Sequence, residues 1–163
     1  MAVNMFLKIE GPEVKSESVV SGHEGEIDID AFSWGMSQSG SMHVATGGGT
    51  GKVSVQDIHI SKKVDKATPT LMAYCCSGQH FDKATLTVYK AGGDKPVEYL
   101  KIVMDQVLIS SISHGGVDGN ETVNESVSLN FAKYKVTYVP QEAKGMASGG
   151  IDQTWHIAKN APQ

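Results

Sequence analysis

Residues 26–60 read EIDIDAFSWGMSQSGSMHVATGGGTGKVSVQDIHI, a pattern of two β-strands joined by a long glycine-rich loop. Ile27 and Ile29 share one face of an extended segment, and Phe32 and Trp34 share a face a little further along. Side chains of a strand alternate with a period of two, so the parity changes between these two pairs. The change predicts a bulge or bend that re-aims the side chains.

The loop between these strands runs from Ser37 to Gly51 and contains almost no large apolar residue. Met42, His43 and Val44 are its only sizeable side chains. A loop of about fifteen residues is unusual inside a compact domain, and such loops usually have a function or lack order. We therefore expect this loop to add little to the core of its own chain.

Length, composition and charge indicate a globular protein and argue against nucleic acid as a partner. The 163 residues suit one domain spanning 1–163, and 18 glycines with only five prolines favour strands joined by turns. The net charge is −4, and all 14 basic residues are lysine. Without arginine, the chain lacks the residue best suited to forked contacts with guanine and phosphate.

No stretch of the sequence predicts a membrane segment. No apolar run approaches the roughly 20 residues that span a bilayer, and the N-terminal residues lack the pattern of a signal peptide. We expect no membrane insertion, and we expect the chain to fold in the cytoplasm.

Apolar alternation in other segments completes the fold prediction. Parity slips again at Ala132–Lys133, while residues 14–25 are polar and read as a surface loop or short edge strand. The pattern predicts a mainly β fold: a two-sheet β-barrel or sandwich of about eight strands, with one short flanking α-helix and a long extended loop. Outside residues 26–60 the expected strands are Ala2–Ile9, Lys83–Lys90, Val97–Ile112, Thr122–Tyr138 and Thr154–Ala158.

The strand expected at Val97–Ile112 has apolar residues on both faces. By strict alternation, one face carries Leu100, Ile102, Met104 and Leu108, and the other Tyr99, Val103, Val107 and Ile109. A strand that is apolar on both faces is covered twice. In one small domain the second cover is either the helix or another subunit.

The expected helix has recognisable ends and a pair of cysteines. Thr68 is suited to cap it, Pro69 fits the first helical position, and Gly78 fits a left-handed stop. Cys75 and Cys76 are adjacent, which prevents an unstrained disulfide between them. We expect both to be free thiols that pack as small buried side chains.

Two motifs resemble a nucleotide-binding signature and a hydrolase signature, but each lacks required residues. Residues 46–53, TGGGTGKV, approach a phosphate-binding loop, but Thr46 replaces the first glycine and Val53 the magnesium-binding hydroxyl. Residues 35–39, GMSQS, approach a nucleophile elbow without its closing glycine or its helix.

Asp57 and His59 share a strand face and form the one pair that a hydrolase could use. The six histidines show no close ligand spacing. We therefore predict no catalytic, cofactor or metal site.

Several motifs occur in one order along nearly the whole chain. They are MFLKIEG at residues 5–11, SWGMSQSGSMH at 33–43, GKVSVQD at 51–57, TPTLMAYCCSGQH at 68–80, KAGG at 90–93, VEYLKI at 97–102 and VSLNFAKYKVTYVP at 127–140. Together they resemble the Hcp family, the tube protein of bacterial type VI secretion systems.

The resemblance implies a structural function, not an enzymatic one. Members of this family form homo-hexameric rings that stack into a tube inside a contractile sheath, behind a VgrG-type spike. Sheath contraction expels the tube from the cell, so export needs no signal peptide, and in some systems effector proteins bind inside the ring, which protects them. The alternative is a monomeric β-barrel that binds a small ligand or acts as a hydrolase, and solution mass distinguishes the two.

Alternation and the resemblance together suggest which residues line the ring and which contact the next ring. If Phe32 and Trp34 point into the core, Ser33 points away from it. By the same alternation, Ser126, Ser128 and Asn130 oppose Val127, Leu129 and Phe131. We predict that Ser33, Ser126, Ser128 and Asn130 line the ring and contact effectors, and that Met42, His43 and Val44 contact the next ring.

Overall fold

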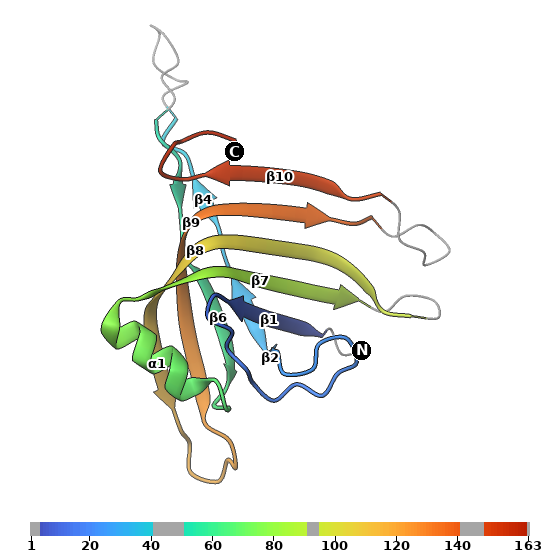
Figure 1. Ribbon diagram of the computed structural model, residues 1–163, viewed down its shortest axis with the longest axis vertical. Coiled ribbons are helices and arrows are strands. Elements are labelled where there is room, and N and C mark those ends of the chain that lie inside the picture. The colour runs from blue at the N-terminus through green and yellow to red at the C-terminus, as the bar shows by residue number, and fades with distance from the viewer. Residues whose placement is uncertain (1–3, 41–50, 91–94, 141–148, 163) are drawn as a thin grey trace, which may run out of the picture.

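The computed structural model describes residues 4–40, 51–90, 95–140 and 149–162, and these form a curled β-sheet with one helix at its side (Figure 1). The mainly β fold is therefore confirmed. The elements are β1 (Met5–Glu10), β2 (Ile27–Ile29), β3 (Ala31–Ser33), β4 (Met36–Ser37), β5 (Ser54–Val55), β6 (Ile58–Lys63), α1 (Thr68–Ser77), β7 (His80–Lys90), β8 (Val97–Gly115), β9 (Asn124–Tyr138) and β10 (Ile151–His156).

The large sheet is antiparallel and has the strand order β2-β1-β7-β8-β9-β6-β3, with β10 paired to β9. β2 and β3 are consecutive in the chain yet lie at opposite ends of this order, so the chain crosses between the two edges at Asp30. There the Asp30 amide donates to the Ser61 carbonyl at 2.8 Å. Ile27 and Ile29 are buried on one side of the crossing, and Phe32 and Trp34 pack against the core on the other. The predicted change of parity is confirmed, and it closes the sheet into a barrel-like shape.

The three longest strands change parity together, which bends the sheet. The core-facing residues step from Phe81 to Ala84 in β7, from Met104 to Val107 in β8, and from Phe131 to Tyr134 in β9. These residues pair in register across the strands, so the extra residue of each strand falls at one line. We call this line the bend.

The bend corrects the prediction for the long strand. The slip at Ala132–Lys133 is confirmed, but β8 slips as well, and Gln106 at that point has φ 54°. Val107 and Ile109 therefore face the core, on the same side as Ile102 and Met104. The outward face of β8 mixes Tyr99, Val103 and Leu108 with Lys101 and Asp105. The prediction was therefore wrong in its division of the residues between the two faces, and the outward face is only partly apolar.

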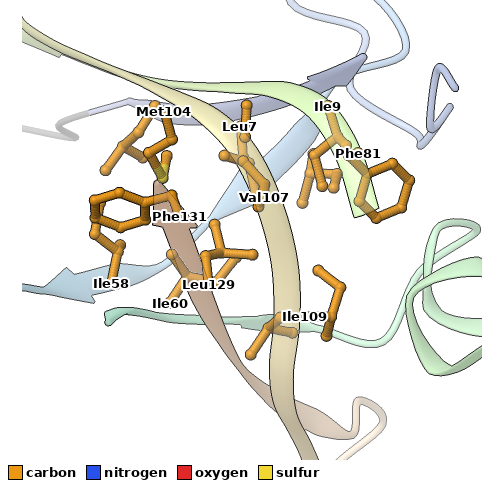
Figure 2. Close-up of a cluster of buried hydrophobic side chains, with 14 of the residues drawn as sticks. Leu7, Ile9, Ile58, Ile60, Phe81, Met104, Val107, Ile109, Leu129 and Phe131 are labelled. Carbon is orange, nitrogen blue, oxygen red and sulfur yellow. The ribbon is translucent and has the colours of Figure 1, made fainter. Parts of the chain in front are cut away.

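The core lies between the two halves of the bent sheet (Figure 2). Burying an aliphatic or aromatic side chain contributes about 1.5–3 kcal/mol, so this cluster dominates the stability of the fold. The side chains with an exposed fraction of 2% or less include Leu7, Ile9, Ile27, Ile58, Ile60, Phe81, Leu86, Ile102, Met104, Val107, Ile109 and Leu129.

Helix α1 packs at the side of the sheet, against β8 (Figure 1). Leu71 is buried, and the Tyr74 ring stacks on Phe81 with centroids 4.2 Å apart. Gly78 ends the helix at φ 71° and donates its amide to the Tyr74 carbonyl, as predicted. Cys75 and Cys76 are free thiols, but Cys76 is exposed because the helix turns that position outward, so its predicted burial was wrong.

A buried ionic network holds the start of this helix. Lys62 and Glu125 form an ion pair with no exposed side-chain surface, and Lys62 Nζ also donates to Asp65 Oδ1 at 2.9 Å. Thr68 Oγ1 donates to Glu125 Oε2 at 3.1 Å, and His114 Nε2 lies 2.8 Å from Glu125 Oε1. Thr68 is thus the first helical residue and serves this network, not the N-cap.

The remaining corrections concern the ends of elements. Ala67 occupies the N-cap without a side-chain bond, and the last strand is Ile151–His156, shifted from the predicted 154–158. Within residues 14–25, Val14, Ser16 and Ser18 are buried. The Ser16 amide donates to the Gly25 carbonyl and the Ser18 amide to the Glu26 carbonyl, so the segment folds back on itself. The segment is a folded hairpin lying along the barrel.

This hairpin is attached to the outer face of β1 and β7 through His23. The imidazole stacks on Phe6 with centroids 4.2 Å apart, its Nδ1 meets the Glu26 carboxylate, and its Nε2 lies 2.7 Å from the Tyr89 hydroxyl. Tyr89 in turn donates to Glu98 Oε2 at 3.2 Å. Burial, and after it the negative charge of Glu98, raises the pKa of Tyr89 to about 12.

The raised pKa predicts a loss of stability in alkali. The unfolded chain releases this proton near the ordinary tyrosine pKa of about 10, whereas the folded chain keeps it until about pH 12. The contribution is therefore complete below pH ~10 and is lost as pH rises from there towards 12. Tyrosinate absorbance should show a late-titrating component that Tyr89→Phe removes. Equal titration with and without the substitution would contradict this.

Candidate functional site

One half of the bent sheet has an outward face made almost entirely of small polar side chains. It is formed by β3, β6, the first half of β9 and the second half of β8. We call it the serine-rich face and define it by Ser33, His59, Ser61, Ser111, Ser113, Ser126, Ser128 and Asn130.

The strand register arranges these side chains in rows. Ser33 pairs with His59, His59 with Ser128, and Ser128 with Ser111. Ser111 Oγ donates to Ser128 Oγ at 2.8 Å, and His59 Nδ1 lies 2.6 Å from the same oxygen. Ser128 is only 7% exposed. It therefore links His59 and Ser111 through hydrogen bonds, and these two neighbours form the solvent-exposed surface.

Asp57 lies at the end of this face next to the bend. Its carboxylate accepts hydrogen bonds from Ser110 Oγ at 2.6 Å and from Asn130 Nδ2 at 2.8 Å. His59 bonds to Ser128 instead, so the pairing of Asp57 with His59 that a hydrolase would need is not formed. At the far end of the face Lys63 pairs with Asp30 at 3.7 Å.

The four residues predicted from alternation come together on this face. Ser33, Ser126 and Asn130 are exposed, and Ser128 faces the same way. Trp34 points inward, with its ring 4.9 Å from that of Tyr134. Sequence reasoning missed His59, Ser61, Ser111 and Ser113, although the alternation of Ile58 and Ile60 with His59 and Ser61 carried the signal.

The predicted inter-ring residues Met42, His43 and Val44 lie outside the described residues, as does most of the glycine-rich motif at 46–53. At the base of that loop β4 and β5 form a two-stranded sheet, and the Gly51 amide donates to the Ser39 carbonyl at 3.4 Å. The GMSQS motif therefore includes a strand, β4, where a nucleophile elbow needs a turn into a helix.

Within the described ranges, no group of three His, Cys, Asp or Glu side chains is placed to hold a metal ion. Among the same residues, no helix is long and apolar enough to cross a bilayer.

Comparison with known proteins assigns the chain to a family. The family model described as "Type VI secretion system effector, Hcp" matches residues 6–138. The chain belongs to the Hcp family. This is a family of secreted proteins of the type VI secretion tube. The matched residues run from the second residue of β1 to the end of β9 and include every residue of the serine-rich face.

Relatives of known sequence and structure agree with this. The chain is 52% identical over 161 residues to Protein hcp1 of Pseudomonas aeruginosa, covering 98% of each chain. It is 34% identical to Hcp1 from Salmonella typhimurium, whose crystal structure superimposes with a TM-score of 0.78 over 98% of both chains. A solved type six secretion system protein gives a TM-score of 0.91 at 26% identity, over 99% of this chain and 100% of that one. The Hcp fold is thus present over nearly the full length.

Proposed function

We propose that this chain is the repeating subunit of a type VI secretion tube, with its serine-rich face lining the lumen of a homo-hexameric ring. The observation that carries the proposal is the face itself, a rigid, strand-borne surface with hydroxyl groups and little charge. Membership of the Hcp family supports it.

Hydroxyl groups suit a lumen that must hold different effector proteins and then release them. Each serine both donates and accepts hydrogen bonds, and each has a short side chain that loses little conformational freedom on contact. Such a surface meets many partners weakly, and it lacks the deep aromatic pocket that typifies a tight binding hot spot. In this proposal the ring also acts as a chaperone for the effectors inside it.

Ring closure requires a head-to-tail interface whose rotation returns to the first subunit. A stable contact of this kind buries at least about 1,200 Å². Rings then stack through the loop at residues 37–51, whose base is held by β4 and β5. The stacked tube lies within a contractile sheath, behind a VgrG-type spike, and contraction exports it from the cytoplasm to the medium or a target cell.

Replacing Ser33 by glutamine tests the lumen assignment. The variant adds bulk without charge at an exposed position, so the ring should keep its mass, roughly six times 17.4 kDa. A co-expressed type VI effector should then lose its protection from degradation, because the longer side chain occupies the contact surface. Pulse-chase of the effector measures the loss.

The matched control is Ala73→Gln, at an exposed position in the middle of α1 and outside the serine-rich face. It should leave both ring mass and effector lifetime unchanged. If the Ser33→Gln ring protects the effector as well as the wild-type ring does, Ser33 does not contact cargo.

A further inference from the structure

The bend opens a groove on the outward side of the sheet. The groove has a volume of about 440 Å³, which is within the range of ligand-binding clefts. Its apolar surface comes from Leu108 and Ala132, both half-buried, because the rings of Phe81 and Phe131 belong to the core (Figure 2). We call it the corner groove.

Exposed polar side chains surround this apolar surface. They are His80, Asp82, Gln106 and Asn130. Gln106 has a positive φ of 54° inside a strand, where a residue other than glycine is uncommon. Backbone in such sparsely populated regions concentrates at binding sites and catalytic sites, and here it belongs to the groove wall.

The corner groove continues the serine-rich face. Leu108 pairs with Asn130 on one side and with His80 on the other, so the three side chains form one row on the outward surface. Asn130 belongs to both features, and its amide is fixed by the bond to Asp57. A partner lying along the serine-rich face therefore reaches the groove without leaving the surface.

The charge of this region is unbalanced. Asp57 lies beside Asn130 at one end of the row, Asp82 follows His80 by two positions in β7, and no described lysine or histidine forms an ion pair with either aspartate. Lys83 and Lys133 lie in the next row, on either side of Asp105 in the strand register. Counted together, the two rows hold three carboxylates and two lysines, which leaves a net charge of −1 among the described residues. The nearby end of α1 carries no basic residue in its last turn, so its carbonyl groups add further negative potential.

We propose that the corner groove binds a lysine or arginine side chain of an effector protein. The methylene groups lie over Leu108 and Ala132, and the cationic head meets Asp82, with the amide oxygens of Gln106 and Asn130 within the same wall. Long basic side chains combine these two properties, an apolar stem and a charged end. The identity of the partner as an effector rests on the proposed function.

Small probes test the chemistry of the groove directly. The three probes are N-acetylargininamide, N-acetylcitrullinamide, which has nearly the same shape without charge, and N-acetylnorleucinamide, which supplies the stem alone. The methyl signals of Leu108 report binding in the labelled protein. The arginine probe should bind about two- to five-fold more tightly than the citrulline probe, the range expected for a partly exposed ion pair.

Asp82→Asn should remove this difference, and Asp105→Asn should not, because Asp105 lies in the next row and outside the groove wall. Equal binding of the arginine and citrulline probes to the wild type would overturn the proposal. So would an identical effect of the two aspartate substitutions.

The effector is tested separately from the groove. Asp82→Asn should shorten the lifetime of a co-expressed type VI effector while ring mass is unchanged. If the substitution abolishes selective binding of the arginine probe but every effector stays protected, an effector is not the occupant. If instead the probes behave as expected and Ser33→Gln changes nothing, the groove stands and the lumen assignment fails.

Discussion

Replacing Lys62 by methionine is expected to lower the free energy of unfolding by about 3–5 kcal/mol. Lys62 and Glu125 form an ion pair with no exposed side-chain surface. The substitution leaves the Glu125 charge buried, and Thr68 and His114 are then its remaining partners among the described residues. For a chain of this length, the loss corresponds to a fall in Tm of roughly 6–20 °C. Thermal and denaturant unfolding measure it.

The neighbouring lysine supplies the control. Lys63→Met removes an exposed side chain whose ion pair with Asp30 spans 3.7 Å, so stability should change by no more than about 0.5 kcal/mol. The double variant Lys62→Met, Glu125→Leu should be more stable than Lys62→Met alone, because no unpaired charge remains. If Lys62→Met matched Lys63→Met, the buried network would not hold the helix.

Tyr134→Ala is the second substitution with a large expected effect. Tyr134 is 1% exposed at the bend, and its ring meets those of Trp34 and Phe131 edge to face. Truncating a buried aromatic side chain costs about 3–5 kcal/mol, which includes the cavity left behind. Because Trp34 precedes the loop at 37–51, the base of that loop should loosen as well, which hydrogen exchange of residues 34–36 detects.

Tyr134→Phe separates packing from hydrogen bonding. It removes only the contact between the hydroxyl and Met36 Sδ at 3.6 Å, so the cost should be about 1 kcal/mol or less. An alanine variant no less stable than the phenylalanine variant would show that the aromatic cluster does not hold the bend.

Simple alternation predicted the parts of the fold where apolar and polar residues separate cleanly. The crossing at Asp30 and the slip after Phe131 were visible because the apolar residues before and after them fall on different parities. The slip at Gln106 was not visible, because β8 has apolar residues on both parities and a strict alternation fits almost as well as the correct one. A positive φ at glutamine leaves no mark in the sequence.

The part of the candidate site that follows from alternation was also predictable. Ser33, Ser126, Ser128 and Asn130 follow from alternation with core residues. Contacts between residues far apart in sequence did not follow: His59 meets Ser128, and Thr68 meets Glu125 57 positions away. The hydrogen-bond partner of a histidine or threonine side chain depends on the register of the paired strands, which the sequence alone does not reveal.

Electron cryomicroscopy of the purified chain tests the central claim most directly. We predict closed rings of six subunits in which Ser33, His59 and Ser126 face the central opening. Monomeric particles would contradict the proposal, as would a ring in which the serine-rich face is buried between subunits or forms the outer wall.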